Sequence, residues 1–262
     1  MTDHAKRRVL TSLQSTGRIG QSTLKQGLIS WFGWAGINFS AIDADASHRT
    51  LSSWYPEHST WLPYQSEEDL LPILNVTTEE PVHLIDFPSQ HTESLLKAFD
   101  NFNALNLFDS SDLRLTVFIF ASDERAAMNS AHLIITAFDS SVDYVIVKNP
   151  ARFTSRIFDS SKPAAHLKKL GAPIIEIPRI TGATLETLDA ASKRAKKALT
   201  FREGESSLEI GSKWELESWR NRLFAQFEDI AQVLLPSADL IQKRVERPKQ
   251  KKLVAAGNPY DL

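Results

Sequence analysis

The sequence predicts an α/β fold with a mostly parallel, doubly wound sheet, and three observations support this prediction. Apolar runs typical of strands alternate along the chain with amphipathic segments typical of helices. The apolar runs are nearly continuous, which indicates strands covered on both faces. With 262 residues, of which 42% are hydrophobic, the chain is long enough to bury a large core.

The strands and helices can be placed approximately. Strands are expected at 9–13, 37–42, 82–86, 113–120, 143–147 and 172–177. Helices are expected at 22–35, 91–107, 123–138, 160–170 and 183–199. Residues 46–80 are poorly patterned, because Pro56, Pro63 and Pro72 interrupt any long helix there.

The C-terminal part has a different composition. Residues 202–213 are polar and contain glycines, so we expect a linker or loop. Residues 214–235 form an amphipathic helix that ends before Pro236 and either packs on the sheet or docks on a partner. We therefore divide the chain into an α/β domain (1–200), a linker with a helix (201–240) and a basic tail (241–262).

Composition narrows the possible functions. The formal net charge of −2 gives no overall bias toward nucleic acid, and the absence of cysteine excludes disulfides and thiolate metal sites. The N-terminus has no apolar signal core, and no apolar stretch is long enough to span a membrane. We expect a cytoplasmic protein.

A short glycine-containing stretch between the first strand and the first helix is the main candidate site. A loop in this position points backbone N–H groups at an anion near a helix N-terminus. The pattern Gly-x4-Gly-Lys-Ser/Thr is incomplete, because Ser15 replaces the first glycine and Gln21 replaces the lysine. Gly20, Ser22 and Thr23 match it. An ordinary strand-to-helix turn is the alternative.

Polar residues follow several of the predicted strands. Asp43 and Asp45 end one strand, Asp86 ends another and Asn149 follows a third. Ligands of parallel sheets bind outside the carboxyl ends of the strands, so these residues favour a nucleotide site. Strand-ending turns and helix caps are the alternative roles of such aspartates.

The order of these motifs resembles that of the ParA/MinD family of deviant Walker A P-loop ATPases (SIMIBI class), including relatives from plasmid partition and conjugation regions. The matching stretches cover roughly residues 7–200. They are Thr16–Thr23, Ile42–Asp45, Leu84–Pro88, Val147–Pro150 and Ile177–Arg179.

The resemblance implies a role for each matched residue. ATP and Mg²⁺ would be the cofactors and a homodimer the assembly. Ser22 and Asp86 would hold the metal, and Asp45, supported by Asp43, would position the attacking water. Asn149 and Pro178 would flank the adenine. The remaining nucleotide contacts would come from the loop residues Gly17, Arg18, Ile19, Gly20, Gln21, Ser22 and Thr23.

Two departures from the family make efficient hydrolysis doubtful. The family places two lysines on the phosphates, and here Gln21 and Thr16 stand at those positions. Phosphoryl transfer needs cations near the transferring group, and removing one such group reduces the rate by about 10²–10³-fold. Arg18 is the one cation inside the loop and either substitutes in part or obstructs the phosphates. Whether the protein is an enzyme is therefore left open.

The tail contains six basic residues that favour phosphate contacts with DNA or an anionic membrane. A solvated tail is the alternative. The basic residues are Lys243, Arg244, Arg247, Lys249, Lys251 and Lys252.

Two functions of different classes follow from the sequence. The first is a ParA/MinD-like protein of DNA segregation or plasmid maintenance that uses ATP weakly or in a modified way. The second is a pseudo-ATPase adaptor that keeps the fold and acts by protein–protein interaction. A cell-division or polar positioning protein would share the same fold. The sequence identifies neither the cargo nor the partner.

Overall fold

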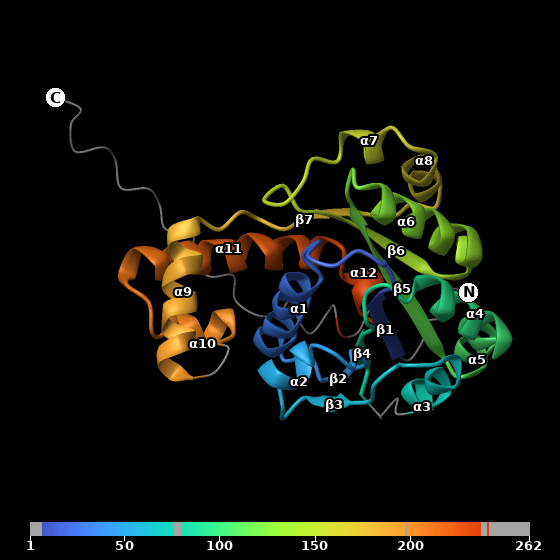
Figure 1. Ribbon diagram of the computed structural model, residues 1–262, viewed down its shortest axis with the longest axis horizontal. Coiled ribbons are helices and arrows are strands. Elements are labelled where there is room, and N and C mark those ends of the chain that lie inside the picture. Colours follow the sequence, from blue (N-terminus) through green and yellow to red (C-terminus); the bar gives the residue numbers. More distant parts are fainter. Residues whose placement is uncertain (1–6, 76–79, 197–198, 237–239, 241–262) are drawn as a thin grey trace.

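A computed structural model describes residues 7–75, 80–196, 199–236 and 240 (Figure 1). Its centre is a seven-stranded sheet in which all neighbouring strands are parallel, in the order β3-β2-β4-β1-β5-β6-β7. The strands are β1 (Arg7–Ser12), β2 (Phe39–Asp43), β3 (Ser59–Trp61), β4 (Val82–Asp86), β5 (Leu113–Ala121), β6 (Asp143–Lys148) and β7 (Ile174–Glu176).

Helices connect the strands and follow the last one. The first half of the described chain holds α1 (Gln21–Ala35), α2 (Thr50–Trp54), η1 (Glu67–Asp69), α3 (Leu70–Asn75), α4 (Thr92–Asn101) and α5 (Ala104–Ser110). The second half holds α6 (Arg125–Phe138), η2 (Asp139–Ser141), α7 (Arg156–Asp159), α8 (Lys162–Lys169), α9 (Gly182–Ala195), α10 (Phe201–Glu205), α11 (Ile210–Asp229) and α12 (Ala231–Leu234).

Both faces of the sheet are covered, because successive side chains of each strand point to opposite faces. On β1, Val9 belongs to the hydrophobic cluster under α3, α4, α5, α6 and α8, whereas Leu10 belongs to the cluster under α1, α11 and α12. On β5, Val117 and Phe118 divide in the same way. The predicted α/β fold with a doubly wound parallel sheet is therefore confirmed.

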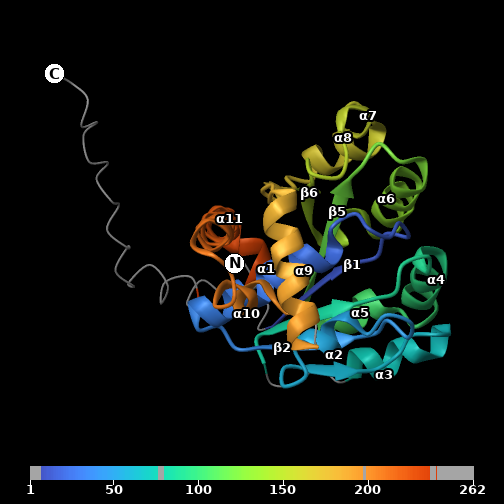
Figure 2. The same cartoon turned by 60° about the vertical axis from the view of Figure 1, so that its left-hand side comes forward.

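The C-terminal helix α11 packs against the sheet domain. Figures 1 and 2 show α9, α10 and α11 together at one end of the molecule, with α11 running past α1. Gly27 on α1 allows this approach, since a Cβ there would lie 2.5 Å from Leu223. The rings of Trp31 and Phe227 are 5.5 Å apart at the centre of this contact. Packing on the sheet is one of the two roles expected for this helix.

Three predicted segments differ from the structure. The helix expected at 91–107 is two helices, because Asn103 has a left-handed backbone (φ 49°) between α4 and α5. The linker expected at 202–213 instead contains α10 and the start of α11. Residues 46–80, expected to be unpatterned, contribute the short α2, the edge strand β3, η1 and α3.

The described part of the chain has no helix that is both long enough and apolar enough to cross a membrane.

Candidate functional site

The carboxyl ends of three neighbouring strands place polar side chains side by side. Ser12 at the end of β1 pairs in register with Asp86 at the end of β4, and Asp86 pairs with Asp43 at the end of β2. The chain leaves β1 here and enters α1 through residues 13–20. The candidate loop therefore lies at the edge of the sheet where ligands of α/β proteins bind.

The end of the loop has a fixed backbone conformation. Gly20 precedes α1 with φ 105°, and a Cβ built on it would lie 2.4 Å from Nδ2 of Asn149 and 3.2 Å from Cδ1 of Ile177. The amide of Asn149 donates a hydrogen bond of 3.1 Å to the carbonyl oxygen of Ile19, whose side chain is fully buried. Only glycine fits here without strain. The end of β6 thus holds the loop in place.

The side chain of Gln21 contacts the start of the loop. Its amide donates to the carbonyl oxygen of Gln14 at 3.3 Å. The buried Gln14 side chain donates in turn to the carbonyls of Phe120 and Ala127 and accepts from the N–H of Phe120. Gln21 therefore stabilises the loop backbone at the position where the ParA/MinD family has a phosphate-binding lysine.

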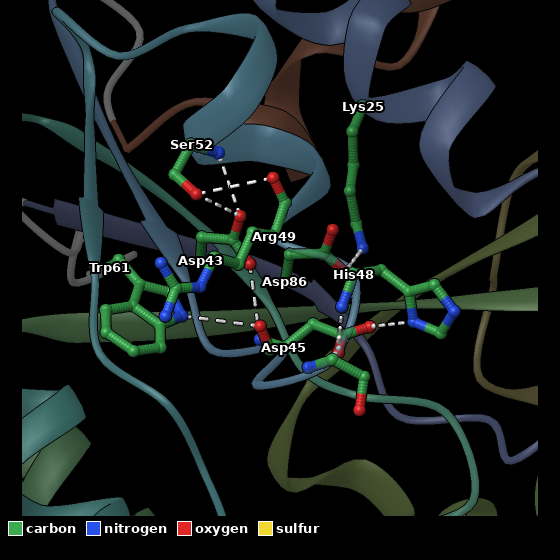
Figure 3. A network of polar contacts seen from close by, with 9 residues as sticks. Lys25, Asp43, Asp45, His48, Arg49, Ser52, Trp61 and Asp86 are labelled. Carbon is green, nitrogen blue, oxygen red and sulfur yellow. Dashed lines mark hydrogen bonds and ion pairs between the residues drawn. The ribbon is translucent and has the colours of Figure 1, made fainter.

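The sequence interpretation missed a lysine that is paired with one of the site residues. Lys25 is on the first turns of α1, and its ammonium forms an ion pair with the carboxylate of Asp86 (Figure 3). The two side chains are 3% and 11% exposed. A signal was present, since Lys25 follows Ser22 by three residues and residues at this spacing share one face of a helix.

The surroundings of Asp86 favour a neutral carboxyl, and Lys25 favours its charged form. Burial raises the pKa of Asp86, the ammonium of Lys25 opposes that rise, and the carboxylates of Asp43 and Asp45 add to it. A lysine is almost never buried without a partner. The ion pair therefore balances the opposite charges of two side chains that the fold buries away from water.

Asp43 and Asp45 organise the segment after β2 (Figure 3). Oδ2 of the fully buried Asp43 accepts hydrogen bonds from the backbone N–H and the hydroxyl of Ser52, at 2.8 and 2.9 Å. Asp45 accepts from the backbone N–H groups of Ser47 and His48 at 2.8 and 3.1 Å. Partial burial acts to raise the pKa of Asp45, but these hydrogen bonds lower it overall.

These contacts show that both aspartates stabilise a turn, as the alternative interpretation of the sequence expected. Asp45 also lines the cavity beside the loop, so its carboxylate remains a candidate for the role that the ParA/MinD resemblance implies. Trp61 on β3 also contacts this turn, since its indole N–H donates to the carbonyl oxygen of Asp45 at 3.4 Å. The guanidinium of Arg49 lies 3.4 Å from the centroid of the Trp61 ring.

A cavity of about 580 Å³ is lined by most of the residues predicted to contact the nucleotide, the metal or the attacking water. Its two cations are Arg18 in the loop and Arg152 after β6, and both side chains are exposed. Of the predicted residues, those lining the cavity are Gly17, Arg18, Gly20, Gln21, Ser22, Thr23, Asp45 and Asp86.

Three predicted nucleotide contacts lie elsewhere. Ile19 is in the hydrophobic core, and Asn149 supports the loop while lining a neighbouring cavity. Pro178 is buried, and its carbonyl accepts a hydrogen bond of 2.8 Å from the indole of Trp219. No contact with a base is defined for Asn149 or Pro178, so that role stays a prediction. The DNA-binding prediction for Lys243–Lys252 lies outside the described residues.

The magnesium ion implied by the ParA/MinD resemblance can be tested against the donors present. Mg²⁺ takes oxygen ligands at 2.0–2.1 Å and is often held by one or two protein groups besides phosphate and water. The expected donors are the hydroxyl of Ser22 and the carboxylate of Asp86, but Asp86 already contacts the ammonium of Lys25. In this arrangement the donor set does not fit a divalent cation.

Comparisons with solved structures give neighbours of one broad class. A ParA family ATPase from Chlorobium tepidum is 13% identical, with a TM-score of 0.44, and the match covers 83% of this chain and 99% of that one. MinD in the MinC:MinD cell division complex of Aquifex aeolicus is 12% identical, with a TM-score of 0.45 and coverages of 84% and 96%.

The signal recognition particle receptor FtsY of Elizabethkingia anophelis gives 12% identity, a TM-score of 0.47 and coverages of 84% and 67%. FlhF, in a structure with GMPPNP and Mg²⁺, is 14% identical, with a TM-score of 0.38, and the match covers 66% of this chain and 64% of that one. These neighbours are P-loop NTPases. No protein-family model and no curated protein sequence matches the chain.

Proposed function

We propose that this protein binds the phosphates of a nucleotide at the β1–α1 loop without turning the nucleotide over efficiently, and that it acts through a protein partner. The observation that carries this proposal is the cavity beside the loop. It joins Gly20, Ser22, Asp45 and Asp86, four polar or glycine positions from three segments far apart in sequence. The proposal combines the weak or modified use of nucleotide from the first function derived from the sequence with the partner-mediated action of the second.

The loop supports binding of an anion. Backbone N–H groups at the start of α1 are free of intrahelical partners, and the helix dipole favours negative charge there. α1 has 15 residues and no acidic residue in its first turn. The guanidinium groups of Arg18 and Arg152 line the same cavity and can form charge-assisted hydrogen bonds with phosphate oxygens.

The same contacts argue against rapid hydrolysis. Gln21 hydrogen-bonds Gln14, and among the described residues the buried hydroxyl of Thr16 has no hydrogen-bond partner. Neither side chain carries a charge that could stabilise a transferring phosphoryl group, and one such charge is typically worth about 10²–10³-fold in rate. The expected nucleotide is ATP or ADP, with GTP as the comparison because two FlhF neighbours were solved with guanine nucleotides.

A role in DNA segregation is the second candidate. A cavity of about 610 Å³ next to the loop is lined by Arg152, Arg156 and Arg179, and its one lining carboxylate is Glu176. This local positive charge stands out on a chain with a net charge of −2 and can attract phosphate backbones. The basic tail would add to that attraction.

Calorimetric titration with ATP, ADP and GTP tests the leading proposal. Wild-type protein should bind at least one of them, and Ser22→Ala and Arg18→Ala should each weaken binding by about tenfold, the loss expected for one charge-assisted or polar phosphate contact. The exposed residues Ser207 and Arg125 supply matched controls, Ser207→Ala and Arg125→Ala. Absence of binding at millimolar nucleotide, or equal loss in the controls, would contradict the proposal.

A further inference from the structure

The ammonium group of Lys25 contacts the carboxylate of Asp86, one of the two residues that the ParA/MinD resemblance assigns to the metal. We propose that Lys25 takes the place of the divalent cation, so that the β1–α1 loop binds phosphate without a metal ion. This inference rests on the proposed function, because it concerns the same loop and the same ligand.

The fold directs Lys25 at Asp86 for local reasons. Leu24 and Leu28 of α1 are almost fully buried against the sheet, which fixes the rotation of the helix about its axis. Residues three apart share a helix face, so the same rotation turns both Ser22 and Lys25 toward the strand ends. The carboxylate that Lys25 contacts is that of Asp86, at the last position of β4.

The ion pair is not a loose surface contact. The side chains of Lys25 and Asp86 are both buried, so water screens neither group effectively. Asp86 is the partner that the structure defines for Lys25 among the described residues. A metal ion entering here would compete for that carboxylate. It would also place two more positive charges beside an ammonium for which the described part of the chain provides no second acceptor.

The charges around the loop are balanced without a metal. The cavity is lined by Arg18 and Arg152 and by the carboxylates of Asp45 and Asp86, so its formal charge is zero before Lys25 is counted. Lys25 does not itself line the cavity, but its ammonium offsets the charge of Asp86 and so leaves one net positive charge for an incoming phosphate. The ammonium of Lys25 can offset part of the charge of a phosphate group. Because Lys25 is a residue of α1, this charge does not depend on the concentration of a free metal ion.

The inference goes beyond the loss of hydrolysis. A site that lost only its lysines would still bind nucleotide more tightly with Mg²⁺, since the metal bridges phosphate oxygens. A site in which Lys25 replaces the metal should bind the free nucleotide as well as its magnesium complex or better. Replacement of Lys25 by a neutral residue of similar length should free Asp86 and create metal dependence.

The test measures nucleotide and metal binding separately. Wild-type protein is titrated with ADP in EDTA and in Mg²⁺, and bound Mn²⁺ is measured by electron paramagnetic resonance with ADP present. We expect the two ADP affinities to agree within about twofold. We also expect the free Mn²⁺ concentration to match that of the same ADP solution without protein, because the carboxylate is occupied and adds no ligand to the metal. Lys25→Met should bind Mn²⁺ together with ADP and should gain about tenfold or more in ADP affinity from Mg²⁺.

The controls separate three outcomes. Lys97→Met, which removes an exposed lysine on α4, should behave like wild type. Free Mn²⁺ that falls below the level of the protein-free ADP solution when wild-type protein is added, or a wild-type affinity that rises about tenfold with Mg²⁺, would overturn the inference while leaving nucleotide binding intact. Absence of ADP binding in every condition would overturn the proposed function as well. The wild-type measurements decide these points even if Lys25→Met does not fold.

Discussion

Asn149 at the end of β6 and Ile19 in the β1–α1 loop are joined by a hydrogen bond between side-chain amide and backbone carbonyl, although 130 positions separate them. This contact explains why an asparagine follows β6. It fixes the carbonyl that precedes Gly20, and Gly20 turns the chain into α1. The loop geometry therefore depends on the packing of Asn149 against the glycine.

Substitution of Gly20 should be destabilising. An alanine would have to adopt φ 105°, and its Cβ would lie 2.4 Å from Asn149. We expect Gly20→Ala to lower the free energy of unfolding by about 1–3 kcal/mol and to weaken nucleotide binding. Gly182→Ala is the matched control, because nothing lies within 4 Å of a Cβ at that position. Urea denaturation of both variants checks this, and equal stability of the two would contradict the assigned loop geometry.

At the amino ends of the strands, opposite the candidate site, an ion-pair network connects the C-terminal helices to β1. The guanidinium of Arg8, 6% exposed, pairs with Asp143 and donates to Thr116 and to the carbonyl of Gln232. Arg114 contacts the same carboxylate at 3.1 Å but is 43% exposed.

Arg8→Met should cost about 2–4 kcal/mol of unfolding free energy, because it leaves the half-buried carboxylate of Asp143 with a weaker partner. Arg114→Met should cost less than about 1 kcal/mol, since solvent screens that pair. The two substitutions remove the same charge from the same carboxylate, so their difference reports the burial of Arg8 together with its hydrogen bonds to Thr116 and Gln232. Chemical denaturation at pH 7 measures both, and similar losses would show that the burial of Arg8 has little energetic effect.

His83 gives the protein a specific sensitivity to acid. Burial on β4 lowers its pKa to about 4, with Arg7 contributing, so the folded state keeps it neutral. An unfolded histidine titrates near 6.5 and therefore binds a proton that the folded state rejects between roughly pH 6.5 and 4. Stability should fall as the pH drops through this window, by about 1–3 kcal/mol in total.

A pair of histidine variants tests that assignment. His83→Asn should flatten the dependence of stability on pH between 6.5 and 4, whatever its stability at pH 7. His132→Asn, at an exposed position of α6, should leave the slope unchanged. Thermal unfolding followed by circular dichroism across this range gives the slopes. If the stability of His83→Asn depends on pH as steeply as that of wild type, a group other than His83 causes the acid sensitivity.

The tail prediction can be tested apart from the loop. Each basic residue within Lys243–Lys252 can displace a counterion from DNA, so binding by the full chain should weaken steeply with salt. A chain truncated after Gln242 should bind much less, and the loss should be the same for unrelated DNA sequences. Gel shifts over a salt series compare the two. Equal affinity would assign any DNA binding to the arginines around the second cavity.

The sequence predicted the sheet well because its buried strands are long apolar runs. The prediction from the sequence missed the short helices and strands. The strand β3 has three residues, and Pro72 lies in the first turn of α3, where a missing N–H does no harm. The start of α10 was predictable, since Thr200 and Glu203 form a capping box.

The site was predicted in part. The residues of the loop and of the strand ends were expected to meet, because parallel strands end at one edge of the sheet. The partner of Asp86 was not expected. Lysine on a helix is normally solvated, and only the rotation of α1 on the sheet shows that Lys25 is buried and aimed at the strand end.

The most direct test of the proposed function is ATP turnover by the purified wild-type protein in Mg²⁺, measured on a sample whose nucleotide binding has been confirmed by calorimetry. With Gln21 on the loop backbone and Lys25 on Asp86, turnover should equal the background of a Ser22→Ala control while ATP or ADP still binds. Turnover that depends on Mg²⁺ and is lost in Ser22→Ala would contradict both the adaptor function and the role assigned to Lys25.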